Sequence, residues 1–108
     1  MINIFSSSRY RINRKKIKDS FKIENYTINI SFVGKNKMRN LAKNYKKEDL
    51  PLPVLSFPYQ GEKIETENLL GEIVICYPQA VLLAAERNRR VEEIIIGLIK
   101  HGIDNLLK

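Results

Sequence analysis

The chain has 108 residues, of which 44% are hydrophobic and 29% are charged. This composition fits one globular domain with a single modest core, and it excludes a disordered chain. No apolar run approaches the length that spans a bilayer, and the start of the chain is too short and polar for the apolar region of a signal peptide. We therefore expect a cytoplasmic protein with no membrane partner, in which the single cysteine, Cys76, is a buried small hydrophobic residue.

Positive charge is concentrated in the first half of the chain. Residues 1–47 contain 13 Lys or Arg and 2 acidic residues, whereas residues 48–108 contain 6 and 10, which together give the net charge of +7. A basic segment favours nucleic-acid phosphates, because each neutralised phosphate releases condensed counterions. A basic surface that is merely solvated is the alternative, and composition does not choose between the two.

The first half contains two strand patterns and two helix patterns. Residues 2–5 predict a short strand, and residues 9–22 predict a short helix with one narrow apolar stripe. Residues 26–32 alternate large apolar with small polar side chains, which predicts a strand buried on one face. Apolar residues recur at i, i+3, i+4 and i+7 in residues 35–45, which predicts an amphipathic helix with a basic outer face.

The second half predicts two strands and two helices. Two prolines break residues 46–53 into a loop, and Pro78 suits the first turn of a helix. The remaining predicted elements are a strand over residues 54–57, a polar surface loop over 59–68, a strand buried on both faces over 73–76, a helix that continues through 80–85, and a last helix over 91–107 with a broad apolar face.

The order of these elements predicts an α+β fold with a mixed α/β layer. We expect a single domain of residues 1–108 with one small sheet of about four strands, backed by helices, and with the C-terminal helix at its centre. Gly97 and Gly102 lie inside that helix, where each costs roughly 1 kcal/mol relative to alanine. We therefore expect close packing or a bound group at both glycines.

Three sequence blocks carry a family resemblance. They are V-L-S-F-P at residues 54–58, L-L-G-E-I-V-I-C at residues 69–76, and the segment that begins with His101 and Gly102. In this order and spacing they resemble the YbeY family of metal-dependent bacterial endoribonucleases, which mature ribosomal RNA. The signature of that family is H-G-x-L-H-L-x-G-Y-D-H, and its three histidines bind zinc. The resemblance runs from about residue 28 to residue 107.

The resemblance implies a zinc site of which His101 is the first ligand. Asn105 stands at the position of the second histidine, and the third would lie three positions beyond Lys108. Catalytic zinc usually has three protein ligands and an open position for water, and an amide oxygen is a poor zinc ligand, so we expect zinc to be weakly bound or absent. One alternative is a rebuilt site that uses Asp104 or Cys76. The other is that His101 is a packed helix residue without a metal.

The loop before V-L-S-F-P differs from the family pattern at the position that the family uses for RNA. The family has an arginine there that is thought to act on the RNA, and this chain has Lys46. The resemblance thus implies Lys46 as the catalytic residue of the loop. The positive charge is kept, but the planar fork that grips phosphate with two hydrogen bonds is lost. The Thr-Asp of the family becomes Leu52-Pro53, which removes two polar groups.

Basic residues of the first half are the candidate RNA-binding residues. If the two basic helices lie side by side on one face of the sheet, they form a continuous positive surface. Tyr10 and Tyr45 could stack on unpaired bases at its rim, or both could face the core. The predicted RNA-binding residues are Arg9, Arg11, Arg14, Lys15, Arg39, Lys43 and Lys46.

The resemblance implies a ribosomal-RNA maturation factor whose partner is ribosomal RNA or the small ribosomal subunit, without specificity for DNA. Three versions stay open at this point. The protein is a zinc-dependent endoribonuclease, or a non-catalytic RNA- or ribosome-binding protein on the same fold, or a truncated copy whose coding sequence was cut within the last helix.

Overall fold

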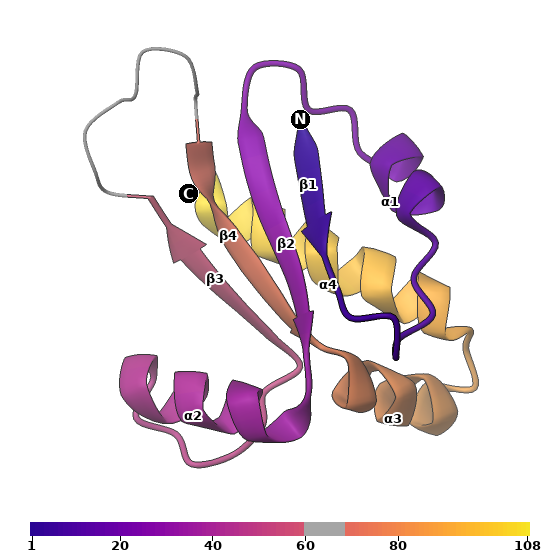
Figure 1. Ribbon diagram of the computed structural model, residues 1–108, viewed down its shortest axis with the longest axis vertical. Helices are drawn as coiled ribbons and strands as arrows, with labels where there is room; N and C mark the ends of the chain where they lie inside the picture. Colours follow the sequence, from indigo (N-terminus) through magenta and orange to yellow (C-terminus); the bar gives the residue numbers. More distant parts are fainter. Residues whose placement is uncertain (60–68) are drawn as a thin grey trace.

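A four-stranded mixed sheet organises the computed structural model, which describes residues 1–59 and 69–108 (Figure 1). The strand order is β1-β2-β4-β3; β1, β2 and β4 are parallel, and β3 pairs antiparallel with β4 at one edge. The elements in chain order are β1 (Ile2–Phe5), α1 (Arg14–Ser20), β2 (Thr27–Val33), α2 (Lys35–Tyr45), β3 (Val54–Pro58), β4 (Leu69–Cys76), α3 (Tyr77–Arg87) and α4 (Val91–Leu106). The predicted α+β fold and the predicted order of elements are confirmed.

The two faces of the sheet pack against different helices. Side chains of β4 alternate between the faces, so that Ile73 and Ile75 join the main core while Val74 and Cys76 join a second, smaller cluster. The main core also takes in buried residues of α1, α3 and α4, whereas the second cluster takes in residues of α2. Among the described residues, three helices therefore cover one face, and α2 covers part of the other.

The last helix, α4, lies across the sheet on the main-core face (Figure 1). Its buried residues come at i, i+1, i+5, i+8 and i+12 from Ile94, and they include Ile95, Ile99, Gly102 and Leu106. Since these positions form one broad apolar face, the helix stays attached along its length. The prediction that the C-terminal helix is central is confirmed.

The first helix is shorter than the predicted range of residues 9–22. It begins after Asn13, whose side-chain Oδ1 accepts a hydrogen bond from the backbone N–H of Lys16 at 3.0 Å. The helix ends at Ser20, and its one buried residue is Ile17. Because so narrow an apolar stripe anchors little more than one turn, the stretch before Asn13 is not helical. The prediction of a helix from residue 9 is wrong.

Strand β4 is longer than its predicted range. The strand predicted over 73–76 begins at Leu69, because pairing with β2 and β3 extends it beyond its most apolar stretch. The predicted surface loop over 59–68 lies outside the described residues except for Tyr59. Within the described ranges, every helix falls short of the length and apolar character that crossing a membrane requires.

The two glycines of α4 differ in their surroundings. A Cβ atom added to Gly102 would lie 2.9 Å from Cδ1 of Ile73, so the close packing predicted there is confirmed. A Cβ atom added to Gly97 would meet nothing within 4 Å. Of the two alternatives expected at Gly97, close packing is therefore wrong, and a bound group stays a prediction.

Candidate functional site

A polar cleft runs along the edge strand β3, between the end of α2 and the last turns of α4. Its volume is about 380 Å³. The cleft brings together residues that are far apart in the sequence, which are Lys46, Glu48, Leu52, Val54, Leu55, Ser56, Pro58, His101, Asn105 and Leu106. Lys46 and His101, two of the residues singled out from the sequence, thus line one cleft.

Helix α4 supplies the far wall of the cleft. His101 and Asn105 are one turn apart, so their side chains leave the same side of the helix, and both are exposed. Gly102 rests directly on Ile73 of the sheet, and its carbonyl oxygen accepts a hydrogen bond from Oγ of Ser56 at 3.3 Å. The helix is thereby held against the edge strand immediately beside His101.

The turn after α2 supplies the near wall. The backbone N–H groups of Lys46 and Glu48 both donate to the carbonyl oxygen of Ala42, at 2.8 and 3.2 Å, and Lys47 adopts a left-handed conformation with φ of 55°. This conformation reverses the chain, so Lys46 and Glu48 both line the cleft. Lys46 therefore stands at the cleft because of a backbone turn.

The other predicted RNA-binding residues lie on two separate surfaces. Arg9, Arg11, Arg14 and Lys15 precede or begin α1, on the face that α4 covers, whereas Arg39 and Lys43 belong to α2 on the opposite face. The two helices do not lie side by side on one face, because their buried residues Ile17 and Met38 belong to different cores. The condition for one continuous positive surface is therefore not met.

Two of these cations, Arg14 and Arg39, have partners. Nη1 of Arg14 donates to the carbonyl oxygen of Ile4 at 2.5 Å, so this guanidinium ties α1 to the end of β1. Nε of Arg39 is 4.0 Å from Oδ1 of Asp49, and both side chains are mostly exposed. A distant exposed pair of this kind contributes little to stability and leaves the arginine accessible.

The two tyrosines behave differently. The ring of Tyr10 stacks on that of Tyr77 with centroids 4.7 Å apart, and it packs on the main core. Tyr45 contacts Phe57 edge to face at 4.8 Å but is 64% exposed. The core-facing position is therefore right for Tyr10 and wrong for Tyr45.

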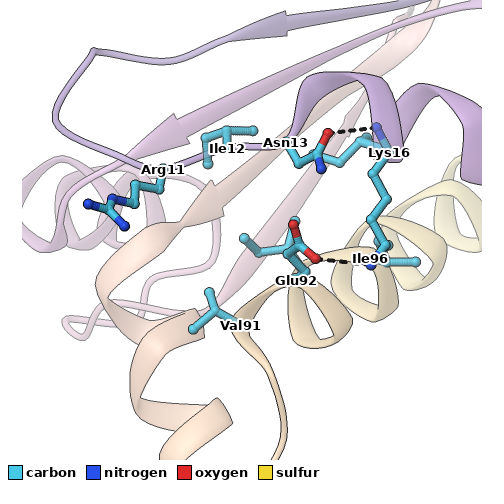
Figure 2. Close-up of a pocket in the computed structure, with 9 residues that line it drawn as sticks. Arg11, Ile12, Asn13, Lys16, Val91, Glu92 and Ile96 are labelled. Carbon is cyan, nitrogen blue, oxygen red and sulfur yellow. Dashed lines mark hydrogen bonds and ion pairs between the residues drawn. The ribbon is translucent and has the colours of Figure 1, made fainter.

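The interface of α1 with α4 encloses a much smaller cavity, of about 30 Å³ (Figure 2). Nζ of Lys16 and Oε2 of Glu92 are 3.0 Å apart across it, and hydrogen bonding to Lys16 holds the pKa of Glu92 below its usual value. A cavity of this size has room for about one or two water molecules, so it is not a ligand site.

The side chains at the polar cleft do not fit a catalytic zinc ion. Such an ion requires three protein ligands, and the cleft offers the imidazole of His101, the amide of Asn105 and the carboxylate of Glu48. Across residues 1–59 and 69–108, no cluster of three or more His, Cys, Asp or Glu side chains could hold a metal. Cys76 cannot complete a set with His101, since it is fully buried in the second cluster on the opposite face, where burial raises the pKa of its thiol.

Asp104 also stays apart from the cleft, since it is exposed on α4 and is not among the residues that line it. Neither alternative ligand considered from the sequence therefore joins His101. Two cleft residues were missed by the sequence analysis: Glu48, whose signal is its place two residues after Lys46, and Ser56, which was assigned only to a buried strand.

These features define an α+β domain whose candidate site lies between an antiparallel edge strand and a C-terminal helix. The chain belongs to the Endoribonuclease YbeY family, whose model matches residues 6–107. The protein is 37% identical over 84 residues to an endoribonuclease YbeY of Finegoldia magna, and this match covers 78% of this chain and 55% of the relative. It is 36% identical over 85 residues to that of Aquifex aeolicus, covering 79% and 56%.

The chain thus spans a little over half the length of these curated relatives. Among solved structures, the solution structure of TM1509 from Thermotoga maritima has a similar fold. Its TM-score is 0.66 at 24% sequence identity, and the match covers 100% of this chain and 73% of that chain.

Proposed function

We propose that this protein takes part in ribosomal-RNA maturation by binding single-stranded RNA in the cleft between β3 and α4. The observation that carries the proposal is the meeting of Lys46, Ser56, His101 and Asn105 in one cleft on a fold of the endoribonuclease YbeY family. Its partner would be ribosomal RNA or the small ribosomal subunit in the cytoplasm, with no preference for DNA.

Each polar side chain of the cleft has a role that suits RNA. The ammonium group of Lys46 pairs with a phosphate as a point charge. The imidazole of His101, the amide of Asn105 and the hydroxyl of Ser56 can bond base edges or a ribose 2′-hydroxyl, the group that distinguishes RNA from DNA. A single strand fits better than a duplex, because only splayed nucleotides present their bases to such a cleft.

Hydrolysis is the second candidate, and family membership favours it. Bound zinc would lower the pKa of its water ligand and so supply a hydroxide. The described residues offer one histidine at the cleft and no three-ligand group, so they do not fit that ion. We therefore expect the 108-residue protein to bind RNA without cutting it.

The test measures fluorescence anisotropy of a labelled single-stranded RNA at several salt concentrations. Lys46→Ala is expected to weaken binding for all sequences and to lower the salt slope by about 1. Lys22→Ala is the matched control, because Lys22 is an exposed lysine outside the cleft. Equal affinity for a DNA of the same sequence, or equal effects of the two substitutions, would contradict RNA binding at this cleft.

The same preparation distinguishes binding from hydrolysis. Metal analysis after purification without a histidine tag is expected to give far less than one zinc per chain, and binding is expected to be unchanged by a chelator. RNA cleavage that stops with a chelator and returns with zinc would show that the protein is a hydrolase. It would also show that zinc has a ligand beyond the residues described at the cleft.

A further inference from the structure

A second groove, between α3 and α4, meets the cleft at His101. Its volume is about 590 Å³. The residues that line it are Arg87, Arg89, Glu93, Ile94, Gly97, Leu98 and His101. His101 lines both the groove and the cleft, so the two hollows are neighbours along α4.

The groove begins at a cluster of arginines in the turn between α3 and α4. Arg87, Arg89 and Arg90, which we call the arginine turn, are three of the six Lys or Arg residues in the otherwise acidic residues 48–108. Asn88 is left-handed with φ of 52°, and the backbone N–H of Arg89 donates to the carbonyl oxygen of Ala84 at 2.9 Å. This helix-ending motif fixes the backbone that carries the three arginines.

The charge of the arginine turn is only partly neutralised. Nη1 of Arg89 is 3.6 Å from Oε2 of Glu93, and their side chains are 64% and 51% exposed. An exposed pair at i and i+4 is weak and is screened by salt, so a phosphate can compete for this guanidinium. Arg87 and Arg90 are also exposed. Glu86 and Glu92 are also close to the turn in the sequence, and Arg90 attracts the carboxylate of Glu92. The groove itself is lined by Arg87, Arg89 and Glu93, so its lining keeps one net positive charge that suits an anionic chain.

One residue of the groove floor, Gly97, has no side chain. Gly97 comes one turn before His101, so Gly97, His101 and Asn105 lie on one line along α4, about 12 Å from first to last. A Cβ atom at Gly97 would meet nothing within 4 Å, so packing does not require a glycine there. The absent side chain instead leaves an open passage from the arginine turn to the cleft.

We propose that this groove holds the backbone of the RNA strand that continues from the cleft, with the strand crossing α4 at Gly97 and its phosphates facing the arginine turn. The inference rests on the proposed function, since the strand enters the groove from the cleft at His101. Single-stranded RNA is favoured over a protein partner by the continuity of groove and cleft and by the arginine turn at the far end.

The experiment compares substitutions at Gly97 with two RNA lengths, one that fills only the cleft and one several nucleotides longer. Gly97→Glu places bulk and negative charge on the groove floor, and Gly97→Gln places similar bulk without charge. Gly97→Ala is the matched control, because it removes the glycine but adds only a methyl group. All three residues are better helix formers than glycine, so weakened binding is not explained by unfolding.

The wild-type protein is expected to bind the long RNA more tightly than the short one. Gly97→Glu is expected to lower the affinity for the long RNA by about tenfold or more, and Gly97→Gln is expected to lower it by less. The affinity of Gly97→Ala is expected to stay within about twofold of wild type. Affinity for the short RNA is expected to be the same in all four proteins. Arg87→Gln with Arg89→Gln is expected to lower the salt slope for the long RNA by about 2, and Lys22→Gln with Lys35→Gln to lower it by less.

Two outcomes overturn the inference in distinguishable ways. If Gly97→Glu binds the long RNA as tightly as Gly97→Ala while Lys46→Ala still weakens it, the groove is not part of the RNA site and the cleft stands. If the wild-type protein binds neither RNA, the proposed function fails and the groove proposal fails with it. If Gly97→Glu abolishes binding of an acidic peptide but leaves the affinity for the long RNA unchanged, the groove belongs to a protein partner. That result would likewise overturn the proposal.

Discussion

The two glycines of α4 allow a matched test of how tightly the helix is packed. Gly97→Ala and Gly102→Ala make the same chemical change inside the same helix. At Gly97 the new methyl group enters open space. At Gly102 it would lie 2.9, 3.0 and 3.1 Å from Cδ1, Cγ2 and Cγ1 of Ile73, which is fully buried. Real Cβ atoms hardly ever approach to 2.9 Å, so the helix or the isoleucine must shift.

The magnitudes follow from two opposing effects. Replacing glycine by alanine inside a helix stabilises it by about 1 kcal/mol, and this gain is common to both variants. Overpacking a filled core costs about 1–3 kcal/mol, and this cost falls on Gly102→Ala alone. We therefore expect Gly97→Ala to be about 1 kcal/mol more stable than wild type, and Gly102→Ala to be about 0–2 kcal/mol less stable.

Thermal unfolding followed by circular dichroism gives the comparison directly. For a domain of this size 1 kcal/mol corresponds to about 4–8 °C in Tm, so the two variants should differ by at least about 4 °C. Urea titration should give the same order with unchanged m-values. If both variants unfold at the same temperature, Gly102 does not contact Ile73 as the structure places it. The contact that holds α4 beside the edge strand, and with it the position of His101 at the cleft, would then be contradicted.

Three further predictions concern the cleft, the α1–α4 contact and the buried thiol. Asn105→His should create a pair of imidazoles with His101, so added zinc should raise the Tm of this variant and leave wild type unchanged. Because the pKa of Glu92 is lowered, its contact with Lys16 stabilises the protein at pH values above 4.5, and this stabilisation is lost as the pH falls below 4.5. In Lys16→Ala, carboxyl titration by NMR should show the pKa of Glu92 return toward its usual value. Because burial raises the pKa of Cys76 above 9.0, iodoacetamide should label it only in denaturant, as mass spectrometry would report, and stability should fall as the pH rises past 9.

The local patterns predicted the elements well because each was set by neighbouring residues. The helix over Lys35–Tyr45 has the predicted bounds, since its apolar spacing and Gly34 before it define both its face and its start. The alternating strand was displaced by only one residue. Cys76 is buried as predicted, since the β-branched run before it has a helix on either side.

The arrangement of elements was less predictable, because it depends on contacts between distant segments. Nothing in the basic pattern of α1 or α2 states which face of the sheet each helix covers. The chain crosses the sheet in the same direction from β1 to β2 and from β2 to β4, so two right-handed crossovers would place both helices on one face. Because Ile17 and Met38 lie in different cores, the two connections have opposite hands, and the general rule does not predict the arrangement. The open surroundings of Gly97 were equally hidden, since a glycine required by packing and a glycine beside a groove look alike in a sequence.

Fold and chemistry are carried by different positions of α4, and this explains how a family member can keep one while changing the other. Leu106 and Gly102 face the sheet and fix where the helix lies, whereas His101 and Asn105 are exposed on the cleft side. Exchanging an exposed histidine for asparagine removes a metal ligand at almost no cost in stability, because surface substitutions usually change stability by less than about 0.5 kcal/mol. The same separation leaves a lysine, a hydroxyl and an amide beside His101 at the cleft, and these are the groups on which the proposed RNA binding depends.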